Sequence, residues 1–178
     1  MIIGIMGKAR SGKDTVAKLF EEADFIRLSF ADNLKWAAKR LFGWDGKKDE
    51  KGRKLLIALG EKLREINSDI WIKSLLNSNS DILHKNIVIS DVRYKNEADW
   101  IKSCNGILIK VIRIDLPHAD ADWRKHASET ELDDYPSDYT IEAKELNELK
   151  ECASVVRNEI FRDRYGALAK KLYSWYGL

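Results

Sequence analysis

Gly7-Lys8-Ala9-Arg10-Ser11-Gly12-Lys13-Asp14-Thr15 decides the fold class, because it follows the apolar run Ile2-Ile3-Gly4-Ile5-Met6 directly and reads G-x-x-x-x-G-K. This pattern is typical of a phosphate-binding loop that joins a buried strand to a helix. The helix N-terminus offers free backbone N–H groups and the positive end of its dipole to a polyphosphate. The sequence therefore predicts a nucleoside triphosphate site at this loop.

Individual residues of the loop have separate expected roles. Gly7 and Gly12 allow the backbone to curl inward, and Lys13 can reach the terminal phosphates as a point charge. Asp14 stands where such loops usually carry a Ser or Thr that ligates Mg²⁺, and the hydroxyl follows one position later as Thr15, so either residue could bind the metal. The expected ATP-binding residues are Gly7, Arg10, Ser11, Gly12, Lys13, Asp14 and Thr15.

The rest of the chain has the pattern of one α/β domain. Apolar runs predict further strands at 25–30, 87–91, 107–113 and 139–141. Apolar residues at helical spacing predict helices that begin after the loop and around 34–41, 56–66, 69–75, 98–105 and 149–160. The charged stretch 46–54 has little to bury, so we expect an exposed connection without chemistry. A chain of 178 residues suits a single domain over 1–178.

Composition argues against several other classes of protein. The 31 basic and 29 acidic residues are interspersed and leave a formal charge of +2, so we expect no nucleic-acid partner. Cys104 and Cys152 lack metal-ligand spacing and are expected to be free, buried thiols. No stretch reaches the about 18 apolar residues that a membrane span needs. We therefore expect a cytoplasmic protein with no membrane partner.

A second phosphate-related feature follows the apolar run 87–90. Asp91 ends this expected strand, and ligand sites cluster at the carboxyl ends of parallel strands. Asp91 is therefore expected beside Lys13, where it would ligate Mg²⁺ through water or orient an attacking oxygen. The alternative is that Asp91 caps the next helix. Arg93 follows two residues later, and its guanidinium can grip phosphate oxygens in a bidentate fork.

Residues 115–137 form a polar insert between two expected strands. A segment of this length that is poor in core-forming residues favours a functional lid. Its basic residues, including Arg124, could close over phosphates. The alternative is a solvated loop in which Arg124 pairs with Glu129 or Glu131.

Four phrases of the chain resemble the bacteriophage-type deoxynucleoside monophosphate kinases of the P-loop nucleoside monophosphate kinase superfamily. They are the loop at 7–15, Ser29-Phe30-Ala31-Asp32, Asp91-Val92-Arg93-Tyr94-Lys95-Asn96-Glu97 and His126-Ala127-Ser128-Glu129-Thr130-Glu131. The last two phrases are much more specific to this family than the loop, which many NTPases share. The match spans most of the chain. The resemblance implies a three-layer P-loop kinase fold with a central parallel sheet. It also implies a helical monophosphate-binding region at about 31–80 and a lid at 115–137 that supplies an arginine.

The resemblance further implies that the γ-phosphoryl group of ATP passes to a deoxynucleoside 5′-monophosphate in the presence of Mg²⁺. Such a transfer needs two phosphates in line and their charge neutralised. The implied catalytic residues are Lys13, Arg93 and Arg124. The metal is expected at Asp14 or Thr15 with Asp91 behind them, and the monophosphate at Asp32, Arg64, Arg93 and Glu129.

Two other functions stay open. Animal-type phosphomevalonate kinases look similar and carry the same G-K-D variant of the loop, so another small phosphorylated acceptor also fits. A noncatalytic nucleotide-binding switch is the second, although the N-K-x-D phrase of switch GTPases is missing from the sequence. The aromatic tail with Tyr173, Trp175 and Tyr176 would pack on its own domain or on a second copy, so a homodimer is one of two expected arrangements.

Overall fold

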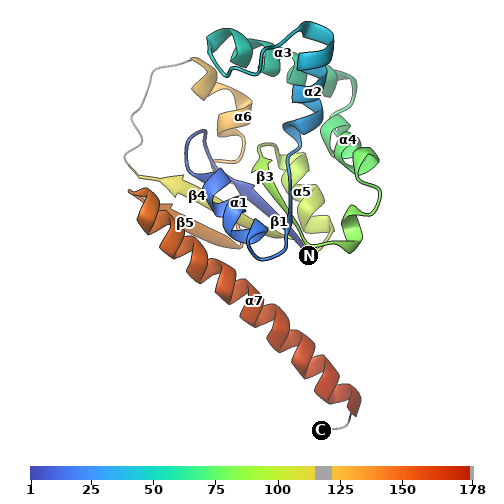
Figure 1. Ribbon diagram of the computed structural model, residues 1–178, viewed down its shortest axis with the longest axis vertical. Coiled ribbons are helices and arrows are strands. Elements are labelled where there is room, and N and C mark those ends of the chain that lie inside the picture. The colour runs from blue at the N-terminus through green and yellow to red at the C-terminus, as the bar shows by residue number, and fades with distance from the viewer. Residues whose placement is uncertain (115–121, 177–178) are drawn as a thin grey trace.

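The computed structural model describes residues 1–114 and 122–176, and its centre is a five-stranded parallel sheet (Figure 1). The strand order is β2-β3-β1-β4-β5, with β1 in the middle. The strands are β1 (Ile2–Met6), β2 (Ile26–Leu28), β3 (Ile87–Val92), β4 (Ile107–Arg113) and β5 (Tyr139–Ala143). All five expected strands are confirmed, and the second is shorter than the apolar run 25–30 suggested.

Helices cover both faces of the sheet, which confirms the three-layer architecture. Helices α1 (Lys13–Glu21) and α7 (Leu146–Tyr176) contribute to the core on one face. Helices α2 (Ala31–Phe42), α4 (Ile70–Ser78) and α5 (Lys95–Ser103) contribute to the core on the other face. Alternate residues of β1 enter the two cores, and every residue of this strand is buried. This two-sided burial explains why β1 is apolar throughout.

The sheet and helix α5 approach each other closely at Gly4 in β1. A Cβ atom at this position would lie 2.5 Å from the Ile101 side chain and 2.9 Å from that of Leu108. Any larger residue would push α5 away from the sheet. Gly4 therefore sets the distance between β1 and α5, which begins directly after the β3 turn that carries Arg93.

The expected monophosphate-binding region, 31–80, contains α2, α4 and α3 (Glu50–Ile66), with the short 3₁₀ helix η1 (Ile82–His84) just beyond it. The expected lid contains the 3₁₀ helix η2 (Asp122–Lys125) and helix α6 (Ala127–Thr130), while its residues 115–121 lie outside the described part of the chain. In Figure 1, α6 and α3 stand above the edge of the sheet where the loop after β1 emerges. The fold thus gathers the candidate residues at one edge.

The far end of α7 runs away from the body of the domain (Figure 1). The tail aromatics lie on this part of α7, but their side chains are not among those that the structure describes, so their packing stays a prediction. Cys104 and Cys152 are free, as expected, yet both are only partly buried, because Cys104 caps the end of α5 and Cys152 lies at the edge of a core. Within 1–114 and 122–176, no helix is both long and apolar enough to span a membrane.

Candidate active site

The loop between β1 and α1 holds its lysine inside the protein. Lys13 is 7% exposed, and its Nζ donates hydrogen bonds to the carbonyl oxygens of Gly7 (2.7 Å) and Lys8 (2.6 Å). Burial, and next the nearby guanidinium of Arg93, lower the pKa of Lys13 to about 7. The backbone around it has left-handed φ angles of 145° at Gly7 and 100° at Gly12, which only glycine adopts readily. The loop is therefore folded around the ammonium group at the position expected for a phosphate site.

Two cavities open beside this loop. The larger, about 700 Å³, reaches from the loop to α2, α3 and α5, and its basic lining consists of Arg10, Lys13, Arg27, Lys35, Lys48, Arg53, Arg64 and Arg93. The smaller, about 480 Å³, lies toward β4, and its basic lining consists of Lys8, Arg93, Lys110, Arg113 and Arg124. Arg93, Ser128 and Glu129 line both cavities. Two anionic groups could therefore enter from different sides and meet near Arg93.

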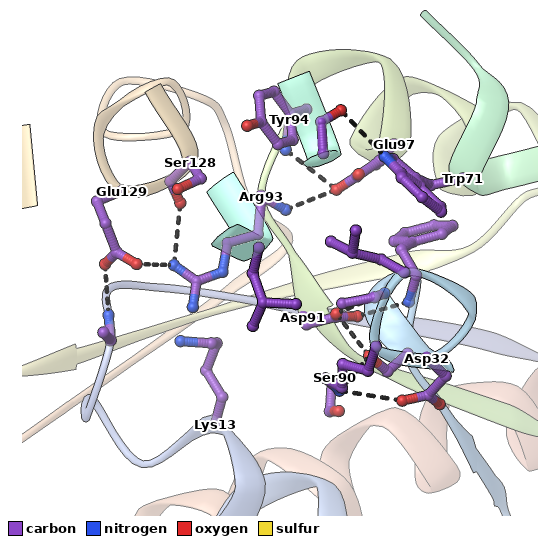
Figure 2. A pocket seen from close by; sticks show the side chains of 18 of the residues that line it. Lys13, Asp32, Trp71, Ser90, Asp91, Arg93, Tyr94, Glu97, Ser128 and Glu129 are labelled. Carbon is purple, nitrogen blue, oxygen red and sulfur yellow. Dashed lines mark hydrogen bonds and ion pairs between the residues drawn. The ribbon is translucent and has the colours of Figure 1, made fainter. Parts of the chain in front are cut away.

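Arg93 is held at both its backbone and its side chain (Figure 2). Its backbone N–H donates to Glu97 Oε2 at 2.8 Å, and its Nη1 donates to the Ser128 carbonyl oxygen at 2.9 Å. The same Nη1 forms an ion pair with Glu129, whose other carboxylate oxygen accepts from the backbone N–H of Ala9 at 2.6 Å. The lid, the β3–α5 turn and the phosphate loop thus meet at one carboxylate.

Arg64 and Glu97 form a second ion pair, in the lining of the larger cavity. Arg64 Nη2 donates to Glu97 Oε1 at 2.8 Å, and the guanidinium lies 3.7 Å from the centre of the Tyr94 ring. Glu97 is 2% exposed, and this burial raises its carboxyl pKa to about 7, although Arg64 acts in the opposite direction. A position on the polar side of its helix would by itself make Arg64 a solvated charge. Its side chain is instead 19% exposed and joins α3 to α5 through Glu97.

Asp91 caps a helix instead of facing the loop freely. Its carboxylate accepts hydrogen bonds from the backbone N–H groups of Phe30 (2.8 Å) and Ala31 (3.0 Å) and from the Ser29 hydroxyl (2.6 Å). These bonds satisfy the N-terminus of α2. The sequence left such a cap as the alternative, but for the helix that follows Asp91. The cap forms on an earlier helix because β2 and β3 are neighbours in the sheet.

Asp14 is a carboxylate of the phosphate loop that is open to the larger cavity. Its side chain is 83% exposed and is ion-paired with Arg27, whose Nε donates to Ser90 Oγ at 3.3 Å. Within 1–114 and 122–176, no three His, Cys, Asp or Glu side chains are grouped to hold a metal alone. Kinase sites bind Mg²⁺ through one or two protein oxygens together with substrate phosphates. Asp14, with Thr15 beside it, fits that arrangement, and the ion would neutralise phosphate charge there.

The segment 46–54 corrects the sequence analysis. Lys48 and Arg53 line the larger cavity, and the Arg53 guanidinium lies 4.3 Å from the centre of the Trp123 ring in the lid. Its Nε also donates to the Lys48 carbonyl oxygen at 3.0 Å. Composition could not distinguish charges that face solvent from charges that face a cavity. One residue of the sequence could have indicated that α3 begins early. Asp49 is a typical N-cap residue, and its side chain caps α3 by accepting a hydrogen bond from the Gly52 N–H at 2.8 Å. A helix that begins there includes Arg53.

The remaining expected residues lie apart from one another. Asp32 is at the exposed rim of the larger cavity and pairs with Lys35 at 3.0 Å. Arg124 lines the smaller cavity, with its guanidinium 5.0 Å from the Trp123 ring centre. The alternative in which Arg124 pairs with lid glutamates does not form among the described contacts, because Glu129 binds Arg93 and Ala9, and Glu131 accepts from Lys95 N–H.

Comparisons with known proteins agree with this geometry. The family model described as Phosphomevalonate kinase matches residues 5–106, which include the loop, α2, α3 and the β3–α5 turn. A protein of Acanthamoeba polyphaga mimivirus named "Putative deoxynucleotide monophosphate kinase" is 35% identical over 165 residues. That alignment covers 74% of this chain and 82% of the viral protein.

Solved structures share the fold at low sequence identity. TT1252 from Thermus thermophilus superposes with a TM-score of 0.54 at 21% identity, covering 89% of this chain and 97% of that one. Shikimate kinase from Acinetobacter baumannii superposes with a TM-score of 0.52 at 13% identity, covering 91% and 93%. Taken with the family model and the viral relative, the loop, the parallel sheet and the two cavities identify this chain as a kinase of the P-loop nucleoside monophosphate kinase family.

Proposed function

We propose that this kinase acts in the cytoplasm, where it transfers the γ-phosphoryl group of ATP to a deoxynucleoside 5′-monophosphate with Mg²⁺ bound. The observation that carries the proposal is the pair of cavities that meet at Arg93, one on each side of the phosphate loop. Direct transfer requires donor and acceptor phosphates to approach in line at one point. The name of the viral relative adds independent support for this acceptor class.

The larger cavity has the chemistry of a nucleotide site. Its lining includes Arg93, whose guanidinium suits the acceptor phosphate, and also the apolar or aromatic side chains of Leu56, Ile57 and Trp71. A deoxynucleoside monophosphate likewise combines a dianionic end with a flat base that stacks on aromatic and apolar side chains. The cavity therefore supports a nucleotide acceptor better than a compact acyclic one.

In this mechanism the protein positions phosphates and stabilises their charge. Lys13 and the loop amides hold the β- and γ-phosphates of ATP, with Mg²⁺ at Asp14 or Thr15. Arg93 holds the acceptor phosphate, which is already an adequate nucleophile. Arg124 reaches the transferring group from the lid, and the lid excludes water so that ATP is not hydrolysed without an acceptor.

Phosphomevalonate is a second candidate acceptor, and the family model that matches residues 5–106 favours it. Its phosphate and carboxylate would both meet cations in the larger cavity.

The test is ADP formation from Mg·ATP with single acceptors. The panel contains the four common deoxynucleoside monophosphates, their ribose counterparts, 5-hydroxymethyl-dCMP and phosphomevalonate, with Lys13→Met as the inactive control. The proposal expects turnover on one or more deoxynucleotides. Turnover on phosphomevalonate alone would replace the proposed acceptor, and tight ATP binding without any turnover would point to a binding role.

A further inference from the structure

The carboxylate of Glu129 occupies an unusual position at the junction of the two cavities. It is 8% exposed, and each of its oxygens has its own partner, the Ala9 backbone N–H at 2.6 Å and the Arg93 guanidinium (Figure 2). These partners belong to the phosphate loop and to the β3–α5 turn, which lie more than 80 residues apart in sequence. Glu129 therefore joins two expected phosphate-binding segments that are far apart in the sequence.

Glu129 is poorly suited to contact a phosphate itself. A carboxylate placed directly against a dianionic phosphate adds repulsion, and both of its oxygens already accept charge-assisted or short hydrogen bonds. Its effect on a bound phosphate must therefore pass through Arg93 and the loop. Glu129 thus lies behind Arg93 in this geometry, whereas the resemblance implied direct contact with the monophosphate.

Arg93 keeps free donors after it has bound Glu129. Its side-chain hydrogen bonds, within the part of the chain that the structure describes, all use Nη1, which binds Ser128 and Glu129. Its Nε and Nη2 remain available for phosphate oxygens in the two cavities that Arg93 lines. Ser128 and Glu129 hold Nη1, and Glu97 holds the backbone N–H of Arg93. These contacts leave the guanidinium plane little freedom to rotate.

Helix α6, which carries Glu129, is itself tied to the acceptor side. His126 Nδ1 accepts from the Ser128 N–H at 3.1 Å, so Nε2 carries the proton and donates to Glu61 in α3 at 2.5 Å. The nearby Arg53–Trp123 contact joins α3 to the lid a second time. Movement of α3 around an acceptor would therefore be transmitted to Glu129 and then to Arg93.

We propose that Glu129 is a positioning residue that sets the orientation of Arg93 against the phosphate loop when the lid docks. The inference rests on the proposed transfer to a deoxynucleoside monophosphate, because it assigns Arg93 the acceptor phosphate. It adds a lid residue that acts on the transition state without touching either substrate.

A double-mutant cycle with Glu129→Gln and Arg93→Ala tests the kinetic part. Glu129→Gln can still accept from Ala9 but offers an NH₂ group to Arg93, so we expect kcat to fall about 10- to 100-fold with little change in the KM for ATP. In the Arg93→Ala background, the same substitution should cost less than about threefold, because the residue acts through Arg93. Asp134→Asn removes a charge from an exposed position of the same lid and should retain wild-type kcat. Independent, multiplying losses would overturn the proposal.

A spectroscopic measurement separates this inference from the proposed function. In ¹⁵N NMR of the ligand-free protein, Glu129→Gln should shift the Ala9 amide signal and broaden the Arg93 Nε–H signal, because the guanidinium gains rotational freedom. Unchanged Ala9 and Arg93 signals would overturn the inference whatever the activity. If the wild type phosphorylates no acceptor of the panel, the proposed function fails, and these two signals still decide whether Glu129 positions Arg93.

Discussion

The proposed donor and acceptor sides of the active site are built in different ways. On the donor side, Lys13 is held by carbonyl oxygens of Gly7 and Lys8, six and five residues away in the same loop. On the acceptor side, the arginines are held by carboxylates far away in sequence: Arg64 is paired with Glu97 across 33 residues and Arg93 with Glu129 across 36. One side depends on local backbone geometry, and the other depends on how helices pack.

This difference indicates which parts of the chain determine acceptor specificity. A loop that folds around its own lysine builds most of its phosphate site from one short segment of the chain. The acceptor cavity is assembled from α2, α3, α5 and the lid, so a change in any of them alters its shape. Donor-side substitutions should therefore reduce turnover of every acceptor equally, whereas acceptor-side substitutions should affect acceptor binding.

The largest expected effect tests the donor side. Lys13→Met removes the ammonium group from the loop, and we expect kcat to fall by about 1000-fold for every accepted substrate, because no other group can replace this charge at the β- and γ-phosphates. The rate of ADP formation under saturating substrates measures it, and circular dichroism checks the fold. Residual activity within tenfold of wild type would show that the loop is not the donor site.

A smaller loss is expected at the lid. Arg124→Ala should lower kcat by about 100-fold while the protein still binds ATP, since this arginine is proposed to meet the transferring group only when the lid is closed. Single-turnover kinetics with ATP and the best acceptor provide the measurement. Intact turnover in Arg124→Ala, alongside an inactive Lys13→Met, would remove Arg124 from the mechanism and leave the loop assignment standing.

Substitution of Arg53 tests the proposed acceptor side. Arg53→Ala should raise the acceptor KM by about tenfold and leave the KM for ATP unchanged, because the larger cavity loses one of its cationic lining residues. Arg40→Ala is the matched control, since Arg40 is exposed on α2 and does not line the cavity. Equal changes in both KM values would mean that Arg53 does not distinguish the two sides.

The smallest expected effect is the uptake of a proton when ATP binds. The pKa of Lys13 is lowered from 10.5 to about 7 by burial, so the lysine in the ligand-free protein is mostly neutral at pH 8. ATP phosphates favour its charged form, and ATP binding at pH 8 should therefore take up a proton. For the same reason, the free energy of unfolding should rise as the pH increases from about 7 toward 10.5.

Calorimetry of ATP binding in two buffers with different ionisation enthalpies measures this uptake. Lys13→Met is the control and should show no uptake at the same pH. Uptake that persists in Lys13→Met would assign the proton to another group.

Much of the fold follows from sequence because it depends on local patterns. The apolar run 2–6 and the glycines of the loop define β1 and the start of α1, and the alternation of apolar runs with helical spacing gives the other layers. The length of β2 was overestimated, because only three of its residues pair with β3. Strand ends depend on the neighbouring strand, which a local pattern does not contain.

The site was predictable only where one segment contains its chemistry. Lys13 and Arg93 lie where the motifs suggested, but Asp91 turned out to cap α2, which required knowing that β2 lies beside β3. Arg53 was missed because its role depends on α3 facing the lid. Long-range packing of this kind decides which charges face a cavity and which face water.

A competition experiment measures which acceptor the kinase phosphorylates. The protein is incubated with Mg·ATP and an equimolar mixture of the four deoxynucleoside monophosphates, their ribose counterparts and phosphomevalonate, and mass spectrometry identifies the diphosphate products. The account predicts that one or more deoxynucleoside diphosphates form first and that Lys13→Met forms none. Predominant formation of mevalonate diphosphate, or of no diphosphate at all, would contradict it.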